Sequence, residues 1–112
     1  QREALRGVAD AMVRAAADGN LHAFLQCDQD CDRIIYEAAR NPFAIDIVTP
    51  LYSHSRRFYC SFGQPDDLTR MAELHADVML AVAEGSETKA SGASDALIDH
   101  LEAFTRAAVG LS

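Results

Sequence analysis

The sequence predicts an all-α protein, an antiparallel bundle of about five to six helices. Apolar residues recur every three or four positions through most of the chain, which is the spacing of amphipathic helices. Glycine, asparagine and proline occur between these segments, and no stretch alternates apolar and polar residues as a strand would. The 112 residues are enough for one hydrophobic core, so we expect a single domain over residues 1–112.

The first two helices are separated by a glycine and an asparagine. Residues 2–18 have apolar side chains at helical spacing, and Gly19 follows where a helix commonly ends. Asn20 has a side-chain carbonyl that accepts hydrogen bonds from the free N–H groups of a first helical turn. We therefore expect the second helix to begin after Asn20 and to run to about Arg40.

Proline marks the third helix and glycine ends the fourth. Pro42 follows an asparagine, and proline is well placed at the first position of a helix, so we expect the third helix to run from Pro42 to about Ser61. Pro50 removes a backbone hydrogen bond within it and predicts a kink. The fourth predicted helix begins at Asp66, in an acidic first turn, and ends at Gly85.

The last helix is expected to follow a polar loop. Residues 86–92 are small or polar, which is typical of a flexible connection. Ser94 is then the expected cap of a final helix that ends near Gly110. Because the chain begins at Gln1 in the middle of a helical pattern, we also expect it to be part of a longer protein.

The composition argues against several classes of protein. With 10 basic and 17 acidic residues the net charge is −7, so this segment should not bind nucleic acid by itself. No apolar run approaches the length of a membrane-spanning helix, and no signal peptide is evident. Three cysteines without a C-x-x-C pair favour a reducing cytoplasm over a disulfide framework.

Several polar residues fall on the faces of the predicted helices that should be buried. Asp28 and Asp32 lie on the apolar stripe of the second helix, and His54, His75 and His100 lie on those of the third, fourth and fifth. An unpaired buried carboxylate costs several kcal/mol, so two on one stripe need a compensating partner. These five residues are the candidate site.

A divalent metal would account for four of these placements. Asp28 and Asp32 are one helical turn apart, with Cβ atoms about 5–6 Å from each other, and would repel without a cation or a proton between them. Asp28, Asp32, His75 and His100 together form an oxygen and imidazole ligand set suited to Zn, Ni or Mn. Metal-free arrangements stay open. The histidines could bond backbone carbonyls, and the aspartates could face solvent, pair with an arginine or pair with the histidines in a metal-free interaction bundle.

Catalysis is the least favoured interpretation. A metal with open coordination positions could activate water, as in metal-dependent hydrolases. Helical phosphohydrolase sites need an adjacent His-Asp pair, whereas this chain has only Asp99-His100, in the reverse order. No residue stands out as a general base beyond the candidate ligands, so we predict that the chain is not an enzyme.

Three segments resemble the motifs of one family of bacterial regulators. Residues 28–42, DQDCDRIIYEAARNP, resemble the D-x-x-F-H-x-x-L-x-x-A-S-x-N-P motif of the FCD domain. Residues 73–85, ELHADVMLAVAEG, and residues 95–101, DALIDHL, resemble its two later motifs in the same order. The FCD domain is the C-terminal domain of FadR-subfamily regulators in the GntR superfamily. The resemblance covers nearly the whole chain.

In the metal-binding branch of that family, the resemblance places the ligands on Asp28, Asp32, His75 and His100, the same four residues that the apolar stripes select. The chain departs from the motif where the family has Phe-His and this sequence has Cys31-Asp32. A carboxylate in place of an imidazole should favour harder ions and add one negative charge.

The resemblance implies an effector sensor. A small carboxylate effector would bind the metal and be held by His54, Arg57 and Arg56, and its binding would change the arrangement of a homodimer. The winged-helix DNA-binding domain and the first helix of the family would lie before Gln1, so DNA would be bound only through that preceding domain. The cysteine pattern and the lack of a membrane-spanning apolar run lead us to expect a cytoplasmic protein that does not contact a membrane.

Overall fold

The protein is an all-helical bundle, as predicted. The computed structural model describes residues 1–39, 53–61 and 65–110. Its helices are α1 (Arg2–Ala17), α2 (Leu21–Ala39), α4 (Pro65–Glu84) and α5 (Glu87–Ala108), and residues 53–61 are also helical. The predicted helix start at Pro42 and the predicted kink at Pro50 lie outside the described residues.

Local sequence determines where the helices end. Gly19 and Gly85 follow α1 and α4 with φ angles of 69° and 78°, a left-handed conformation that costs glycine little. The side-chain oxygen of Asn20 accepts a hydrogen bond from the backbone N–H of Ala23 at 3.1 Å, which caps the start of α2. The predicted boundaries at these three positions are confirmed.

The predicted loop over residues 86–92 is wrong, because α5 begins at Glu87. Ser86 is the cap of this helix, and its hydroxyl accepts a hydrogen bond from the backbone N–H of Lys89 at 3.2 Å. Glu87 places a negative charge in the first turn, where the helix dipole favours it. The polar composition of this segment reflects its position on the outside of the bundle.

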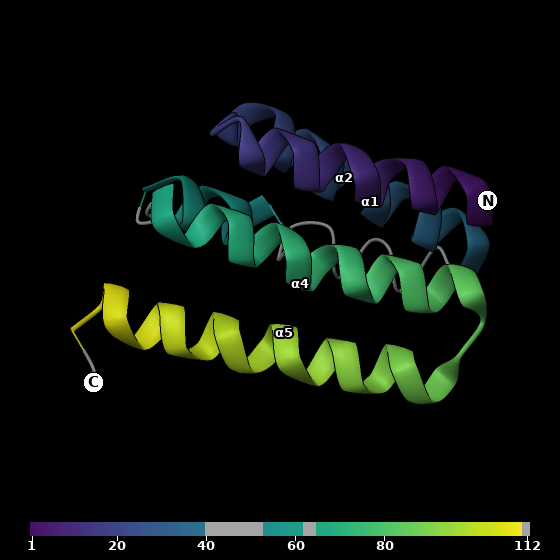
Figure 1. Ribbon diagram of the computed structural model, residues 1–112. Coiled ribbons are helices and arrows are strands. Elements are labelled where there is room, and N and C mark those ends of the chain that lie inside the picture. Colours follow the sequence, from purple (N-terminus) through teal and green to yellow (C-terminus); the bar gives the residue numbers. More distant parts are fainter. Residues whose placement is uncertain (40–52, 62–64, 111–112) are drawn as a thin grey trace.

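Helix α4 lies in the middle of the molecule (Figure 1). It packs against α1 and α2 on one side and against α5 on the other, and α1 also packs against α2. Three methionines, Met12, Met71 and Met79, are the largest completely buried side chains and join α1 to α4. Helix α5 has no fully buried residue, and its Leu97 and Phe104 are only partly covered by the core. This helix therefore forms one edge of the bundle.

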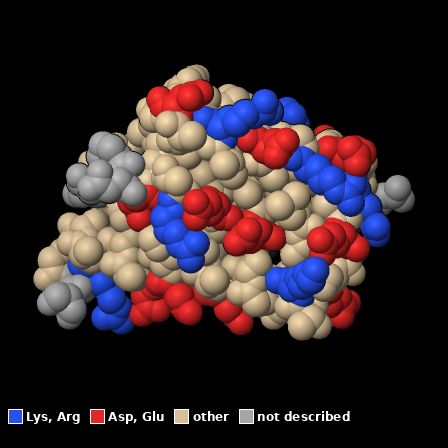
Figure 2. Space-filling model, in the orientation of Figure 1, with Lys and Arg blue, Asp and Glu red and all other residues tan. Residues whose placement is uncertain are grey.

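The surface carries both signs of charge. Acidic and basic side chains alternate over the face shown in Figure 2, without a continuous basic area. Among the described helices, none combines the length and the hydropathy that a bilayer crossing requires.

Candidate functional site

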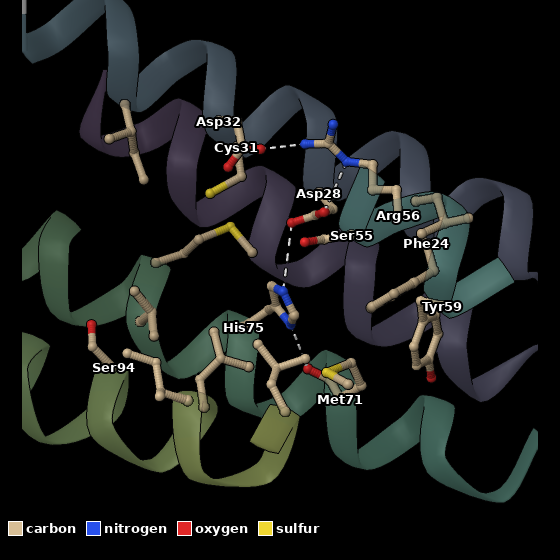
Figure 3. A pocket seen from close by; sticks show the side chains of 17 residues that line it. Phe24, Asp28, Cys31, Asp32, Ser55, Arg56, Tyr59, Met71, His75 and Ser94 are labelled. Carbon is tan, nitrogen blue, oxygen red and sulfur yellow. Dashed lines mark hydrogen bonds and ion pairs between the residues drawn. The ribbon is translucent and has the colours of Figure 1, made fainter. Parts of the chain in front are cut away.

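A cavity of about 340 Å³ lies between α2, the helical segment 53–61, α4 and α5 (Figure 3). All four elements contribute side chains to its wall. Most of the wall is apolar, α2 and the segment 53–61 contribute its aspartates and arginine, and α4 contributes the imidazole of His75. The volume falls within the range of about 300–1,000 Å³ that is common for small-molecule sites.

An arginine bridges the two aspartates of α2. The Nε–H group of Arg56 donates to Oδ2 of Asp28 at 3.0 Å, and its Nη2 group donates to Oδ2 of Asp32. The Arg56 side chain is 18% exposed and each carboxylate is 19% exposed, so all three charges are largely removed from water. The guanidinium thus supplies the positive charge that the aspartate pair needs.

His75 faces the same cluster from α4. Its Nδ1 lies 2.9 Å from the carbonyl oxygen of Met71, and its Nε2 lies 3.5 Å from Oδ1 of Asp28. Since a carbonyl oxygen only accepts hydrogen bonds, Nδ1 carries a proton and donates it. The other ring nitrogen is thereby directed at Asp28, as Figure 3 shows, and the edge of the ring packs against Phe24.

The arginine does not fully offset the burial of the second carboxylate. Burial raises the pKa of Asp32 to about 6, the charge of Asp28 contributes to this rise, and Arg56 opposes both effects. Burial and the same two carboxylates raise the pKa of the neighbouring Cys31 thiol to about 12. In the absence of a metal, Cys31 is therefore a protonated thiol at neutral pH.

The structure places His100 in a different cluster. Its Nε2 lies 2.6 Å from Oδ1 of Asp67, and the hydroxyl of Tyr59 donates to Oδ2 of the same carboxylate at 3.4 Å. Burial and the Asp67 charge raise the pKa of Tyr59, so its hydroxyl remains a donor. Of the four predicted metal ligands, Asp28, Asp32 and His75 line the cavity together and His100 does not. Within residues 1–39, 53–61 and 65–110, no three His, Cys, Asp or Glu side chains are grouped as metal ligands.

Of the three predicted effector residues, one lines the cavity and two do not. Arg56 lines the cavity, whereas His54 and Arg57 are exposed and lie outside its lining. Successive residues of a helix point about 100° apart, so with Ser55, Arg56 and Tyr59 facing the cavity, both of these side chains point elsewhere.

Three hydroxyl residues of the wall, Ser55, Tyr59 and Ser94, are not predicted as lining residues from the sequence. The sequence pattern predicts Ser94 as a helix cap, although it lies inside α5. The sequence does give one indication that a cation lies in the cavity wall. Two aspartates on one apolar stripe require a cationic partner, and Arg56 is such a partner.

The described helices thus form a bundle with a ligand-sized cavity that carries charged residues on its wall. Residues 1–103 match the family model of the FCD domain. The chain belongs to this family, which supplies the effector-binding domains of GntR-type transcription regulators. The family is regulatory, which confirms the prediction that the chain is not an enzyme. No curated protein and no solved structure matches the chain.

Proposed function

We propose that this domain senses a small organic acid for a GntR-type regulator of the FadR subfamily, and that the cavity beside Arg56 is its effector site. The observation that carries the proposal is the group of largely buried charges, Asp28, Asp32 and Arg56, on the wall of an otherwise apolar cavity. Clustered buried charges in a cavity are a frequent mark of binding sites, because stability alone rarely favours them.

The contacts of His75 support a divalent metal beside Asp28. Two ligands with bonds of about 2.1 Å to a tetrahedral ion lie about 3.4 Å apart. The distance between His75 Nε2 and Asp28 Oδ1 is 3.5 Å. A metal-binding histidine also donates its other N–H to an acceptor such as a carbonyl oxygen, as His75 does to Met71. A bound ion there, for which Zn, Ni and Mn are the candidates, would attract a carboxylate.

The remaining two predicted ligands fit less well. Asp32 is bound by Arg56, and His100 is paired with Asp67, so both would have to exchange partners to reach an ion held by Asp28 and His75. The set of four metal ligands therefore stays a prediction. The distance between His75 and Asp28 supports these two residues as ligands. Arg56 hydrogen-bonds to Oδ2 of Asp28 and leaves Oδ1 directed at His75.

The charge of the cavity shows why a metal would matter for an acid. Asp28, Asp32 and Arg56 carry a net charge of −1 when both carboxylates are ionised, which disfavours a carboxylate effector. A divalent cation would change this sum to +1 and reverse the preference. His54 and Arg57 stay predicted effector residues, although both are exposed and lie outside the cavity lining.

A response to the effector also requires the whole regulator. Effector binding would have to favour one arrangement of a homodimer over another, because a ligand shifts an equilibrium only by its difference in affinity for the two states. DNA would be bound by a winged-helix domain preceding this one, in the cytoplasm.

The first test is the metal content of the purified domain by mass spectrometry. Wild type is compared with Asp28→Ala/His75→Ala and with the control His54→Ala, which replaces an exposed histidine outside the cavity. We expect near-stoichiometric metal in wild type and control and a loss in the double variant, with circular dichroism confirming that all three fold. No metal in wild type, even after incubation with Zn, Ni and Mn, would refute the metal part of the proposal.

A metal-free effector pocket is the second candidate, and the Arg56 bridge favours it. A guanidinium already neutralises part of the aspartate pair without an ion. In that case a chelator leaves the melting temperature unchanged, whereas removal of a bound metal lowers it by mass action.

A further inference from the structure

We infer that the effector of this domain is a compact, largely hydrocarbon molecule with a single charged head group, such as a branched, straight-chain or aromatic monocarboxylic acid. The inference rests on the proposed function and specifies its ligand. The described wall disfavours the hydroxylated and polycarboxylic acids, in which polar groups are distributed over the whole molecule.

Among the described residues of the cavity wall, the polar atoms are unevenly distributed. Asp28, Asp32, Arg56 and His75 form one connected cluster through their hydrogen bonds and close contacts. A single head group can reach this cluster. A second or third polar group of the same molecule would have to be satisfied elsewhere on the wall.

Apart from His75, the wall contributed by α4 and α5 offers little to such groups. It contains Val78 and Met79 from α4 and Leu97, Ile98 and Leu101 from α5. Ser94 is the one hydroxyl residue that α5 adds to this wall. A sugar acid or a tricarboxylate placed here would leave several of its own hydrogen-bonding groups unpaired, which weakens binding.

The same wall is incompletely buried by the rest of the domain. Ile98 is 59% exposed and Leu101 is 37% exposed, and α5 has no fully buried residue. A hydrocarbon body in the cavity would cover these side chains and extend the core toward α5. The burial of apolar surface on both molecules supplies the driving force.

The volume sets the size of the ligand. A cavity of 340 Å³ accommodates about ten non-hydrogen atoms if each takes roughly the 30 Å³ of a water molecule in the liquid. Acids with hydrocarbon portions of about four to eight carbons fit this space.

Isothermal titration calorimetry on the metal-loaded protein tests the inference. The compounds are straight-chain acids from acetate to octanoate, phenylacetate, the polar acids malate, citrate and glucuronate, and hexylamine. We expect the affinity of the straight-chain acids to rise about three- to fourfold for each added methylene until the cavity is full. Malate, citrate and glucuronate should bind at least tenfold more weakly than hexanoate.

A variant pair shows whether the apolar wall is responsible. Val78→Thr replaces a methyl group of the wall by a hydroxyl of similar size and should reduce the gain per methylene. Val82→Thr is the matched control, because Val82 lies one turn later on α4, is 39% exposed and is outside the cavity lining. It should bind the series as wild type does, and melting curves establish that both variants are folded.

The outcomes separate the inference from the proposed function. Tighter binding of the polar acids, or affinities independent of chain length, would overturn the apolar specificity and leave an organic-acid sensor. Binding of hexylamine but not of hexanoate would overturn the carboxylate head group and support the apolar body. Absence of binding by every compound would refute both.

Discussion

Asp32 is a residue that this fold would be more stable without. Its carboxylate is 19% exposed, lies one helical turn from Asp28 and has a pKa raised from 3.8 to about 6. Replacement by asparagine keeps the size of the side chain and an oxygen that accepts from Arg56, but removes the charge. We therefore expect Asp32→Asn to stabilise the metal-free protein at neutral pH.

The size of the effect follows from the pKa. A rise from 3.8 to about 6 corresponds to about 3 kcal/mol of preference for the protonated form in the folded state, and solvent screening at the exposed edge reduces this to about 2 kcal/mol. The folded state binds more protons than the unfolded state between these two pKa values, so stability falls as pH rises through this window. The penalty is absent below about pH 3.8 and complete above about pH 6.

Urea denaturation of the protein in chelator, followed by circular dichroism from pH 4 to pH 8, measures this difference. Asp32→Asn should exceed wild type by about 2 kcal/mol at pH 7.5 and equal it near pH 4. Asp30→Asn is the control on the same helix, since its carboxylate pairs only with neighbours one turn away and should change stability little. A variant that is less stable than wild type by the same amount at every pH would refute the argument.

Three further predictions concern α5. Gly85→Ala should destabilise the protein by about 1 kcal/mol, because the φ angle of Gly85 is 78°. Gly92→Ala should stabilise it by up to about 1 kcal/mol, because Gly92 lies inside α5 with open space at its Cβ position. Thermal melts that change in the same direction for both variants would contradict this pair of predictions. Ser86→Ala removes the cap hydrogen bond and should cost about 1 kcal/mol, with faster hydrogen exchange confined to the first turn of α5. Asp67→Asn weakens the contact with His100 and should lower the free energy of unfolding by about 1 kcal/mol. It should also speed amide hydrogen exchange in the second half of α5. Unchanged exchange there would show that this contact does not stabilise the packing of α5.

The fold could be predicted where a local feature decides it. Gly19, Asn20 and Gly85 act through their own backbone or side chain within one turn, so their effect can be read without knowledge of the tertiary structure. The beginning of α5 was missed because a polar segment forms a loop or an exposed helix with equal ease. What decides between them is the cap by Ser86 and the outer position of α5 in the bundle.

The sequence indicates which polar residues line the site better than it indicates which side chains pair with one another. Asp28, Asp32 and His75 line the cavity, and the sequence singles them out because each is a polar side chain on an apolar stripe. Their partner Arg56 is 28 and 24 residues away from the two aspartates along the chain, and its role depends on how the segment 53–61 docks on α2. The pairing of His100 with Asp67 is likewise a result of how α5 lies against α4, which periodicity does not specify.

Removal of a bound metal should weaken acid binding by at least tenfold. Without an ion, the charges of Asp28, Asp32 and Arg56 sum to −1 and oppose a carboxylate, and a divalent cation reverses the sign. One unit charge about 5 Å away contributes about 3 kcal/mol at an effective dielectric constant of about 20. Even after screening, the loss of two charges predicts at least a tenfold fall in affinity.

The measurement is calorimetric titration of hexanoate into protein that is metal-loaded, chelator-treated, or chelator-treated and reloaded. Binding that returns on reloading in wild type, but not in Asp28→Ala/His75→Ala, supports an ion at these two residues. Equal affinity in all three preparations would refute it, because Arg56 would then have to leave an aspartate to receive the acid. That exchange predicts a different signature, tighter binding in Asp32→Asn, where one of the two competing carboxylates is neutral.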